Sequence, residues 1–267
     1  MKTIFSYFFF FTSLLFLMGC KPDAGREVNT VSDNDTHSMT LSGSISKWNK
    51  PEGDINIMGY FVAPQFSGTI DSKGHLEILL PDDFNNLTAS AFAKADSSET
   101  LGYALEIPNA QETFANTDGL VFDGATVELA LAGKNYGFQV FQRSEYVTTI
   151  YPTTSAEFIK QVITPSVNKA ITGTYYYFIY SEKPVGIKGN NSTQQLFSNE
   201  NDESYDLSTV YEVSIKPGWN TLKHEVKEIT SSTDAKYSAS SRVLISTVHD
   251  LPEPMLWVSL ASQKTAL

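Results

Sequence analysis

Alternation of apolar and polar residues with a period of two constrains the fold of this chain more than any other sequence feature. From Thr40 onward, most segments alternate in this way or are rich in β-branched and aromatic residues, and turn-forming residues bound them. Such segments predict β-strands, because successive side chains of a strand point to opposite faces of its sheet. Short strands at this spacing favour sandwiches over alternating βαβ units, so we expect an all-β protein with one or two β-sandwich-like domains. A hairpin is expected over residues 68–80, with its turn at 71–74, and strands are expected over residues 41–48, 54–62, 87–92, 102–107, 126–132, 137–142, 173–181, 209–216, 220–229, 237–248 and 255–260.

A single segment favours a helix. Residues 156–163 carry four apolar residues on one helical face, Thr154 or Ser155 is placed to cap the start, and Pro165 ends the segment. The sequence therefore predicts at most one short helix in the folded part.

The polar stretch over residues 108–119 is the best candidate for a domain boundary. It divides the folded part into residues 40–112 and residues 113–267. In the first part, residues 41–45 and the hairpin at 67–81 resemble the small transthyretin-like or carboxypeptidase-regulatory-like β-sandwiches of bacterial surface proteins. The resemblance implies a small β-sandwich, which a second β-rich domain follows.

A Pro-Gly turn marks the second part. Pro217 presets φ at the second turn position, and Gly218 can take the positive φ that a type II turn requires at the third. Trp219 then leaves the turn and can lay a large apolar surface over the end of a sandwich. The segment resembles the Lys-Gly-Trp-Asn hairpin of uncharacterised all-β bacterial lipoproteins, with a Tyr-rich strand before it, here in residues 176–189, and a Trp-centred strand after it, here 252–258. This resemblance implies a fold and a location but no activity.

Residues 1–19 have the pattern of an export leader. Lys2 gives a positive start, and residues 4–18 carry no charge but are fewer than the roughly 20 that a spanning helix needs. Residues 17–20, Leu-Met-Gly-Cys, resemble a bacterial lipobox. The resemblance implies a lipoprotein signal peptide that is cleaved before Cys20, a diacylglyceryl group on the Cys20 sulfur, and acylation of the new amine. An ordinary cleaved signal with a chance Cys, or an uncleaved anchor, stays open as the alternative.

Residues 20–39 then comprise the lipidated Cys20 and a flexible tether, because they contain few large apolar residues and no period. We expect a lipid bilayer as partner, through the acylated Cys20, and a location in the bacterial cell envelope outside the cytoplasm. Lys21 rather than Asp follows the Cys, which favours the outer membrane if the organism is Gram-negative. The formal net charge of −11 argues against nucleic acid as a partner, and leaves a glycan or an envelope protein for the folded part.

No motif in the sequence assigns catalysis or a metal. The four His are dispersed, and the single Cys excludes an intramolecular disulfide and a Cys-based zinc site. Loop carboxylates could bind Ca²⁺ or hydrolyse glycosides, although a solvated loop is the simpler interpretation. These carboxylates are Asp82, Asp83, Glu200, Asp202, Glu203 and Asp206. We therefore assign no catalytic residue and no cofactor.

The most distinctive run is residues 174–180, Thr-Tyr-Tyr-Tyr-Phe-Ile-Tyr. As a strand it places Tyr175 and Tyr177 on one face and Tyr176 and Phe178 on the other. The favoured interpretation is a central strand that is buried on both faces. An exposed aromatic strip that stacks on sugar rings or anchors a protein is the alternative.

Three hypotheses about function follow. The leading one is a non-catalytic, membrane-anchored envelope lipoprotein that acts in binding or structure. The second is a carbohydrate-binding lipoprotein, with Tyr175, Tyr177 and Trp219 as candidate ligand-binding residues. The third is an extracytoplasmic hydrolase that uses loop carboxylates.

Overall fold

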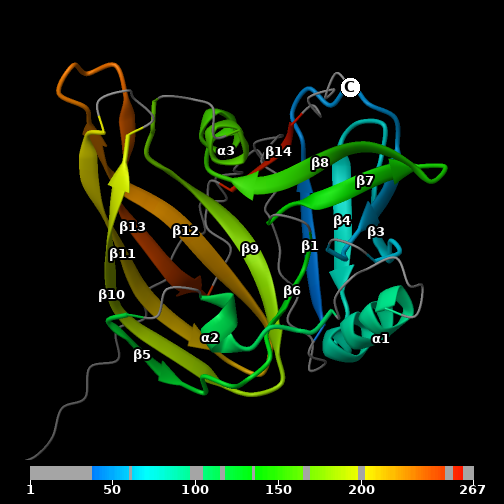
Figure 1. Cartoon of the computed structure of the whole chain (residues 1–267). Helices are drawn as coiled ribbons and strands as arrows, with labels where there is room; N and C mark the ends of the chain where they lie inside the picture. The colour runs from blue at the N-terminus through cyan, green and yellow to red at the C-terminus, as the bar shows by residue number, and fades with distance from the viewer. Residues whose placement is uncertain are drawn as a thin grey trace, which may run out of the picture.

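The computed structural model describes residues 38–59, 62–96, 105–114, 118–133, 136–164, 169–197, 202–249 and 255–260. In these residues the fold is mostly β, as expected, and fourteen strands belong to one hydrogen-bonded sheet (Figure 1). The strands are β1 (Met39–Ser44), β2 (Gly53–Asn56), β3 (Phe66–Ile70), β4 (His75–Leu80), β5 (Leu120–Asp123), β6 (Ala130–Leu131), β7 (Phe138–Gln142), β8 (Glu145–Thr153), β9 (Gly173–Ser181), β10 (Val185–Leu196), β11 (Ser204–Ile215), β12 (Gly218–Ser231), β13 (Ser238–Val248) and β14 (Leu256–Leu260). The helices are α1 (Phe84–Asp96), α2 (Ala110–Thr113) and α3 (Ala156–Ile163). Among these described helices, none has the length and apolar character needed to cross a membrane.

The sheet runs in the order β1-β4-β3-β2-β7-β8-β9-β12-β13-β11-β10-β5, while β14 pairs with β8 and β6 pairs with β9. Every pairing is antiparallel except that of β11 with β13, which is parallel. Figure 1 shows the sheet bent into two lobes. The first lobe contains β1–β4, β7, β8 and α1, and the second contains β5, β10–β13 and α2. Strand β9 lies between the lobes.

Strand β9 supplies side chains to two separate hydrophobic cores. Its even-numbered face, with Tyr176, Phe178 and Tyr180, packs into the first core, and its odd-numbered face, with Tyr175, Tyr177 and Ile179, packs into the second. All six side chains are at most 6% exposed. The favoured interpretation of this run, a strand buried on both faces, is therefore confirmed.

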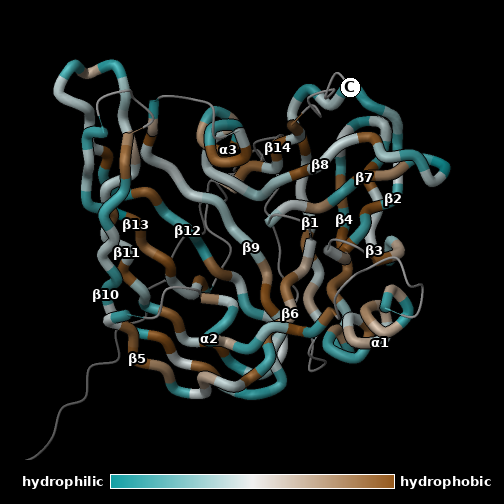
Figure 2. The backbone as a smooth tube through the Cα atoms, in the orientation of Figure 1, coloured by the Kyte–Doolittle hydropathy of each residue, from teal (hydrophilic) through white to brown (hydrophobic). Residues whose placement is uncertain are grey.

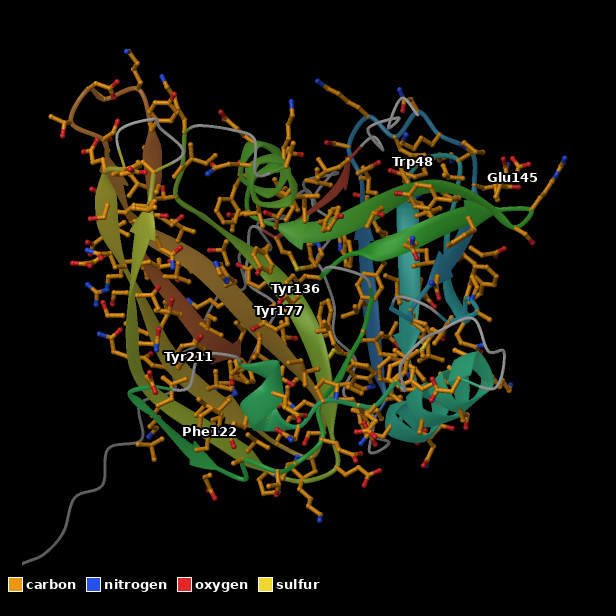
Figure 3. All side chains as sticks on the ribbon, viewed as in Figure 1. Trp48, Phe122, Tyr136, Glu145, Tyr177 and Tyr211 are labelled. Atoms are coloured by element: carbon orange, nitrogen blue, oxygen red, sulfur yellow. The ribbon has the colours of Figure 1, made fainter. Side chains whose placement is uncertain are left out.

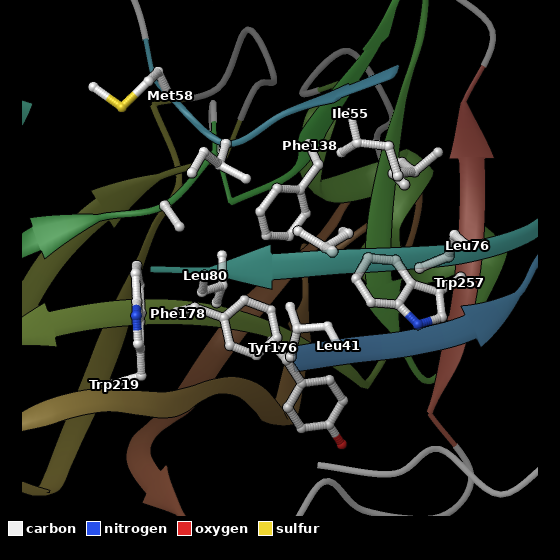
Figure 4. Close-up of a cluster of buried hydrophobic side chains, with 14 of the residues drawn as sticks. Leu41, Ile55, Met58, Leu76, Leu80, Phe138, Tyr176, Phe178, Trp219 and Trp257 are labelled. Atoms are coloured by element: carbon white, nitrogen blue, oxygen red, sulfur yellow. The ribbon is translucent and has the colours of Figure 1, made fainter. Parts of the chain in front are cut away.

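The first core is built largely from the inward face of the first lobe (Figure 4). In β4, burial alternates strictly, so that Leu76, Ile78 and Leu80 point inward while the residues between them face solvent. The ring of Phe138 lies 6.0 Å from that of Phe178 and 6.1 Å from that of Trp257. These contacts join β7, β9 and β14 through one apolar cluster.

The two cores do not divide the chain at the boundary expected between residues 112 and 113. Strand β7 follows that boundary but pairs with β2, which precedes it. Phe138, Val140 and Ile150 accordingly belong to the same core as Leu41 and Ile55. The chain thus crosses from the first lobe to the second and back.

The expectation of at most one short helix is wrong, since the described residues contain three. Residues 87–92, expected as a strand, lie in α1. Its buried residues are Phe84, Asn85, Thr88 and Ala91, a spacing that fits one face of a helix and not of a strand. The high alanine content of this segment also favours a helix. The six residues expected as a strand are too few to show the helical period of about 3.6 residues.

The other two helices have clear N-caps. The expected helix over residues 156–163 is confirmed, and Ser155 rather than Thr154 caps it, because the Ser155 Oγ accepts from the Phe158 N–H at 3.2 Å. Helix α2 lies inside the stretch expected to be a linker. There Asn109 and Glu112 form a reciprocal capping box.

The expected Pro-Gly turn is present, with Gly218 at a φ of 90°. The Asn220 side chain closes it, since Oδ1 accepts from the Lys216 N–H at 2.9 Å and Nδ2 donates to the Lys216 carbonyl at 2.7 Å. Trp219 then enters the first core. Its Nε1 donates to the Pro81 carbonyl at 2.8 Å, and its ring lies 4.8 Å from Phe84. The Trp219 side chain is 4% exposed, so it anchors the turn to α1 and does not form a surface for ligands.

We expect Trp219→Ala to lower the free energy of unfolding by about 3–5 kcal/mol, because a buried ring is replaced by a cavity. Trp219→Phe retains most of the ring and should cost about 1 kcal/mol through the lost hydrogen bond. Chemical denaturation measures both values. As a control, Val121→Ala at a 73% exposed position should stay within about 0.5 kcal/mol of the wild type. Equal effects of Trp219→Ala and Val121→Ala would contradict the anchoring role.

Candidate functional site

The second lobe has an inner face, which we define as the side of its sheet that forms the second core. Strand pairing aligns one row of residues across this face, from β9 through β12, β13, β11 and β10 to β5. The row consists of Tyr175, His224, Ile245, Tyr211, Gly189 and Leu120. Figure 2 shows hydrophobic stretches in β5, β12 and β13 of the same lobe.

The rows on either side of this one are also uncharged. On one side, the pairs Tyr177–Leu222 and Val213–Ile187 are aligned, and Phe122 lies beside Ile187. On the other side the paired residues are Val226, Val243, Thr209 and Asn191. In these three rows, the described inner face therefore presents aromatic, aliphatic, hydroxyl and amide groups but no Asp, Glu, Lys or Arg.

Four tyrosines and a histidine gather on this face, and we name them the tyrosine cluster: Tyr136, Tyr175, Tyr177, Tyr211 and His224. The ring of Tyr136 lies 5.2 Å from that of Tyr175 and 4.8 Å from that of Tyr177. His224 stacks on Tyr175 at 4.8 Å with an interplanar angle of 13°. Figure 3 shows Tyr136 beside Tyr177, with Tyr211 and Phe122 farther along the inner side of the curved sheet.

Tyr136 reaches the cluster from the connection between β6 and β7. Its φ of 64° is in the left-handed region, which is uncommon for a residue with a side chain. The next residue, Gly137, lies against Tyr151, and a Cβ atom there would overlap the Tyr151 ring. This backbone path lays Tyr136 over Tyr175 and Tyr177 while its side chain stays 38% exposed. Tyr136 is thus the member of the cluster that faces solvent.

The hydroxyls of Tyr175, Tyr177 and Tyr211 have no hydrogen-bond partner within the part of the chain that the structure describes. The side chains are 5%, 6% and 8% exposed, respectively. Elsewhere in the described residues, four polar side-chain atoms are fully buried and have no hydrogen-bond partner. These atoms are Trp48 Nε1, Asn85 Oδ1, Thr88 Oγ1 and Trp257 Nε1. The side chains of these three tyrosines are therefore buried, and none of their hydroxyls finds a hydrogen-bond partner among the described residues.

Burial keeps the whole cluster neutral. It raises the pKa of Tyr177 well above its ordinary value, and the neighbouring phenols of Tyr175, Tyr136 and Tyr211 raise that pKa further. Burial likewise raises the pKa of Tyr136, Tyr175 and Tyr211. Burial lowers the pKa of His224 from 6.5 to about 4. At neutral pH the cluster accordingly offers four protonated hydroxyls and a neutral imidazole, all of which can both donate and accept.

A groove of about 420 Å³ lies on the opposite face of β9, β12 and β13. Tyr176, Lys223 and Ser246 form an aligned row in it, and His249 lies at its end. Figure 4 shows the Tyr176 hydroxyl pointing away from the first core. The charged groups in this groove already pair with one another, since Lys223 Nζ lies 2.8 Å from a Glu225 carboxylate oxygen. The groove is therefore a weaker candidate than the tyrosine cluster.

In the described residues, no group of three or more His, Cys, Asp or Glu is placed to hold a metal ion, so the loop carboxylates there do not form such a group. The Glu203 carboxylate accepts from the Thr233 N–H and hydroxyl at 2.7 Å each. The Asp82 carbonyl, rather than its carboxylate, accepts from the Tyr180 hydroxyl. Glu200 and Cys20, the expected lipid acceptor, lie outside the described residues.

The structure thus brings two of the three candidate ligand-binding residues, Tyr175 and Tyr177, into one site, but not as an exposed strip. Trp219 lies in the other core. Sequence reasoning missed Tyr136, Tyr211 and His224, which join the site from three different segments. No protein family, no curated protein and no solved structure matches this chain.

The buried imidazole predicts a pH dependence of stability. The unfolded chain takes up a proton at His224 below about pH 6.5, whereas the folded chain does so only below about pH 4. The contribution of His224 is therefore complete above pH 6.5 and is lost as the pH falls toward 4, by up to about 3 kcal/mol. The side chains that face it from β9 and β13, Tyr175 and Ile245, carry no charge at neutral pH.

Urea unfolding at several pH values between 7 and 4 measures this loss. His224→Phe keeps a flat ring against Tyr175 and should show a smaller decline in stability with acid than the wild type. The exposed His249 provides the control, because His249→Gln should decline as the wild type does. Identical pH profiles for His224→Phe and the wild type would contradict the assignment.

Proposed function

We propose that this protein is a non-catalytic binding lipoprotein of the bacterial cell envelope, which is held to a membrane by an acylated Cys20. The sequence of residues 17–20, which ends an uncharged segment that follows the positive Lys2, carries this proposal. Two or more acyl chains anchor a protein stably in a bilayer, whereas one chain binds only marginally. A tether of about 20 residues has an r.m.s. span of roughly 25 Å, which would hold the folded part clear of the headgroups.

A binding role is supported by the inner face of the second lobe. An uncharged surface with buried rings and hydroxyls that lack protein partners is suited to holding a small molecule, because pockets combine apolar walls with a few polar groups. The outer membrane is the proposed location if the organism is Gram-negative, because Lys21 follows the Cys.

The two alternatives have less support. The carbohydrate-binding hypothesis depends on a row of exposed aromatics, and all the side chains from Tyr175 to Tyr180 are buried. The hydrolase hypothesis needs two acids that converge in a cleft. Asp82 and Asp83 are both exposed just before α1, and neither lines the grooves described on the sheet.

Cys20→Ala should abolish labelling of the protein by radioactive palmitate and remove it from the membrane fraction, because the acyl acceptor is gone. Labelling in cells followed by fractionation and immunoprecipitation measures both effects. Lys21→Ala is the matched control, since it changes the neighbouring residue but keeps the sulfur. Palmitate labelling of Cys20→Ala at the wild-type level would refute the proposal.

A further inference from the structure

We propose that the tyrosine cluster binds an uncharged small molecule that combines an apolar ring or chain with at least one hydrogen-bonding group. This inference specifies the ligand class for the proposed binding role and rests on that role. It is carried by three observations, which are the unpartnered hydroxyls, the uncharged lining and the apolar walls.

The first observation is that three buried tyrosine hydroxyls of the cluster lack a hydrogen-bond partner in the described part of the chain. Leaving a buried polar group without a hydrogen bond costs about 1–3 kcal/mol, and buried polar groups in proteins are generally satisfied. Here the hydroxyls of Tyr175 and Tyr177 come from β9 and that of Tyr211 comes from β11, on the same face of the sheet with β12 and β13 between them, and within the described residues none has a protein partner. Water or a ligand, rather than another described side chain, has to supply the missing hydrogen bonds. A ligand with a hydroxyl, amine or carbonyl group can replace that water.

The lining selects against charge. A charged group that moves into a site without a counter-charge loses its hydration and gains no ion pair. None of the three aligned inner-face rows contains a charged residue, and the histidine of the cluster is neutral at pH 7. The ion-paired Lys223 and Glu225, which flank His224 in β12, line the groove on the opposite face.

The apolar side chains beside the cluster suit a ligand with an apolar ring or chain. Ile187, Val213 and Leu222 are buried beside the cluster, while Leu120 and Phe122 are only partly buried against the same core. Partly buried apolar side chains leave apolar surface in contact with water. A ligand that covers this surface gains binding free energy, because the apolar area is removed from water. Tyr136 lies at the solvent side of the cluster and can contact the ligand with one face of its ring.

Two fluorescent probes with the same aromatic skeleton test the ligand class. N-phenyl-1-naphthylamine is neutral and has one N–H donor, and 8-anilinonaphthalene-1-sulfonate adds a sulfonate to that skeleton. Fluorescence titration of the purified full chain should show tighter binding of the neutral probe by at least about tenfold, the equivalent of about 1.4 kcal/mol. Equal or tighter binding of the sulfonate would overturn the inference.

Variants locate the binding. Tyr177→Phe removes one hydroxyl and keeps the ring, and should weaken binding of the neutral probe about fivefold through one lost hydrogen bond. Tyr136→Ala removes the solvent-side ring and should weaken it at least as much. Tyr176→Phe is the matched control, because it removes a hydroxyl from the neighbouring residue, on the opposite face of β9. Acyl chains or a leader would bind the probe equally in every variant, so the differences between variants are decisive.

The result is interpretable even where a substitution affects folding. Tyr177→Phe removes a hydroxyl that has no protein partner, so its unfolding midpoint should equal or exceed that of the wild type. Tyr211→Phe provides a second hydroxyl deletion from another strand. Probe binding that is unchanged in Tyr177→Phe, Tyr211→Phe and Tyr136→Ala would overturn the site. Probe binding by a protein whose Cys20 proves unlipidated would refute the anchor and leave the site standing.

Discussion

The burial of β9 on both faces is the constraint on which the rest of the structure depends. A strand with one solvent face needs one partner layer, but Tyr175–Tyr180 bring six large side chains that all require cover. The chain meets this requirement by building a lobe on each side of β9, with its own core. The strands of the first lobe therefore come from both ends of the sequence, since β1–β4 and β14 are needed to enclose the even-numbered face.

The sequence predicts those elements that carry a clear local signal. Strand β4 alternates strictly, the Pro-Gly turn needs Gly218 in a positive φ, and α3 begins at a Ser N-cap. Strands β8 (Glu145–Thr153) and β10 (Val185–Leu196) were not expected. Strand β8 is buried without interruption from Thr148 to Thr153 and so does not alternate there, and the outer half of β10 is polar because it extends past the core. The sequence predicts a strand over residues 87–92 of α1, because the helical period becomes visible only over all thirteen residues of the helix.

The candidate site is harder to predict than the strands that build it. Tyr175 and Tyr177 stand out locally, but His224 and Tyr211 join them only through the order β9-β12-β13-β11, which includes a parallel pair. No short-range pattern specifies that order, because β11 precedes β12 in the chain but lies beyond β13 in the sheet. Tyr136 depends on a left-handed backbone residue beside a glycine, a feature that has no periodic signal.

Both faces of β9 carry buried tyrosines, but the hydroxyls of these tyrosines differ in their hydrogen bonds. On the even-numbered face, the Tyr180 hydroxyl donates to the Asp82 carbonyl and so ties β9 to the start of α1. On the odd-numbered face, the hydroxyls of Tyr175 and Tyr177 find no such partner among the described residues. Phenylalanine would fill nearly the same volume there without leaving a buried polar group to be satisfied by water. Tyrosine at these positions is therefore not explained by packing alone, and this is the physical ground of the binding role proposed above.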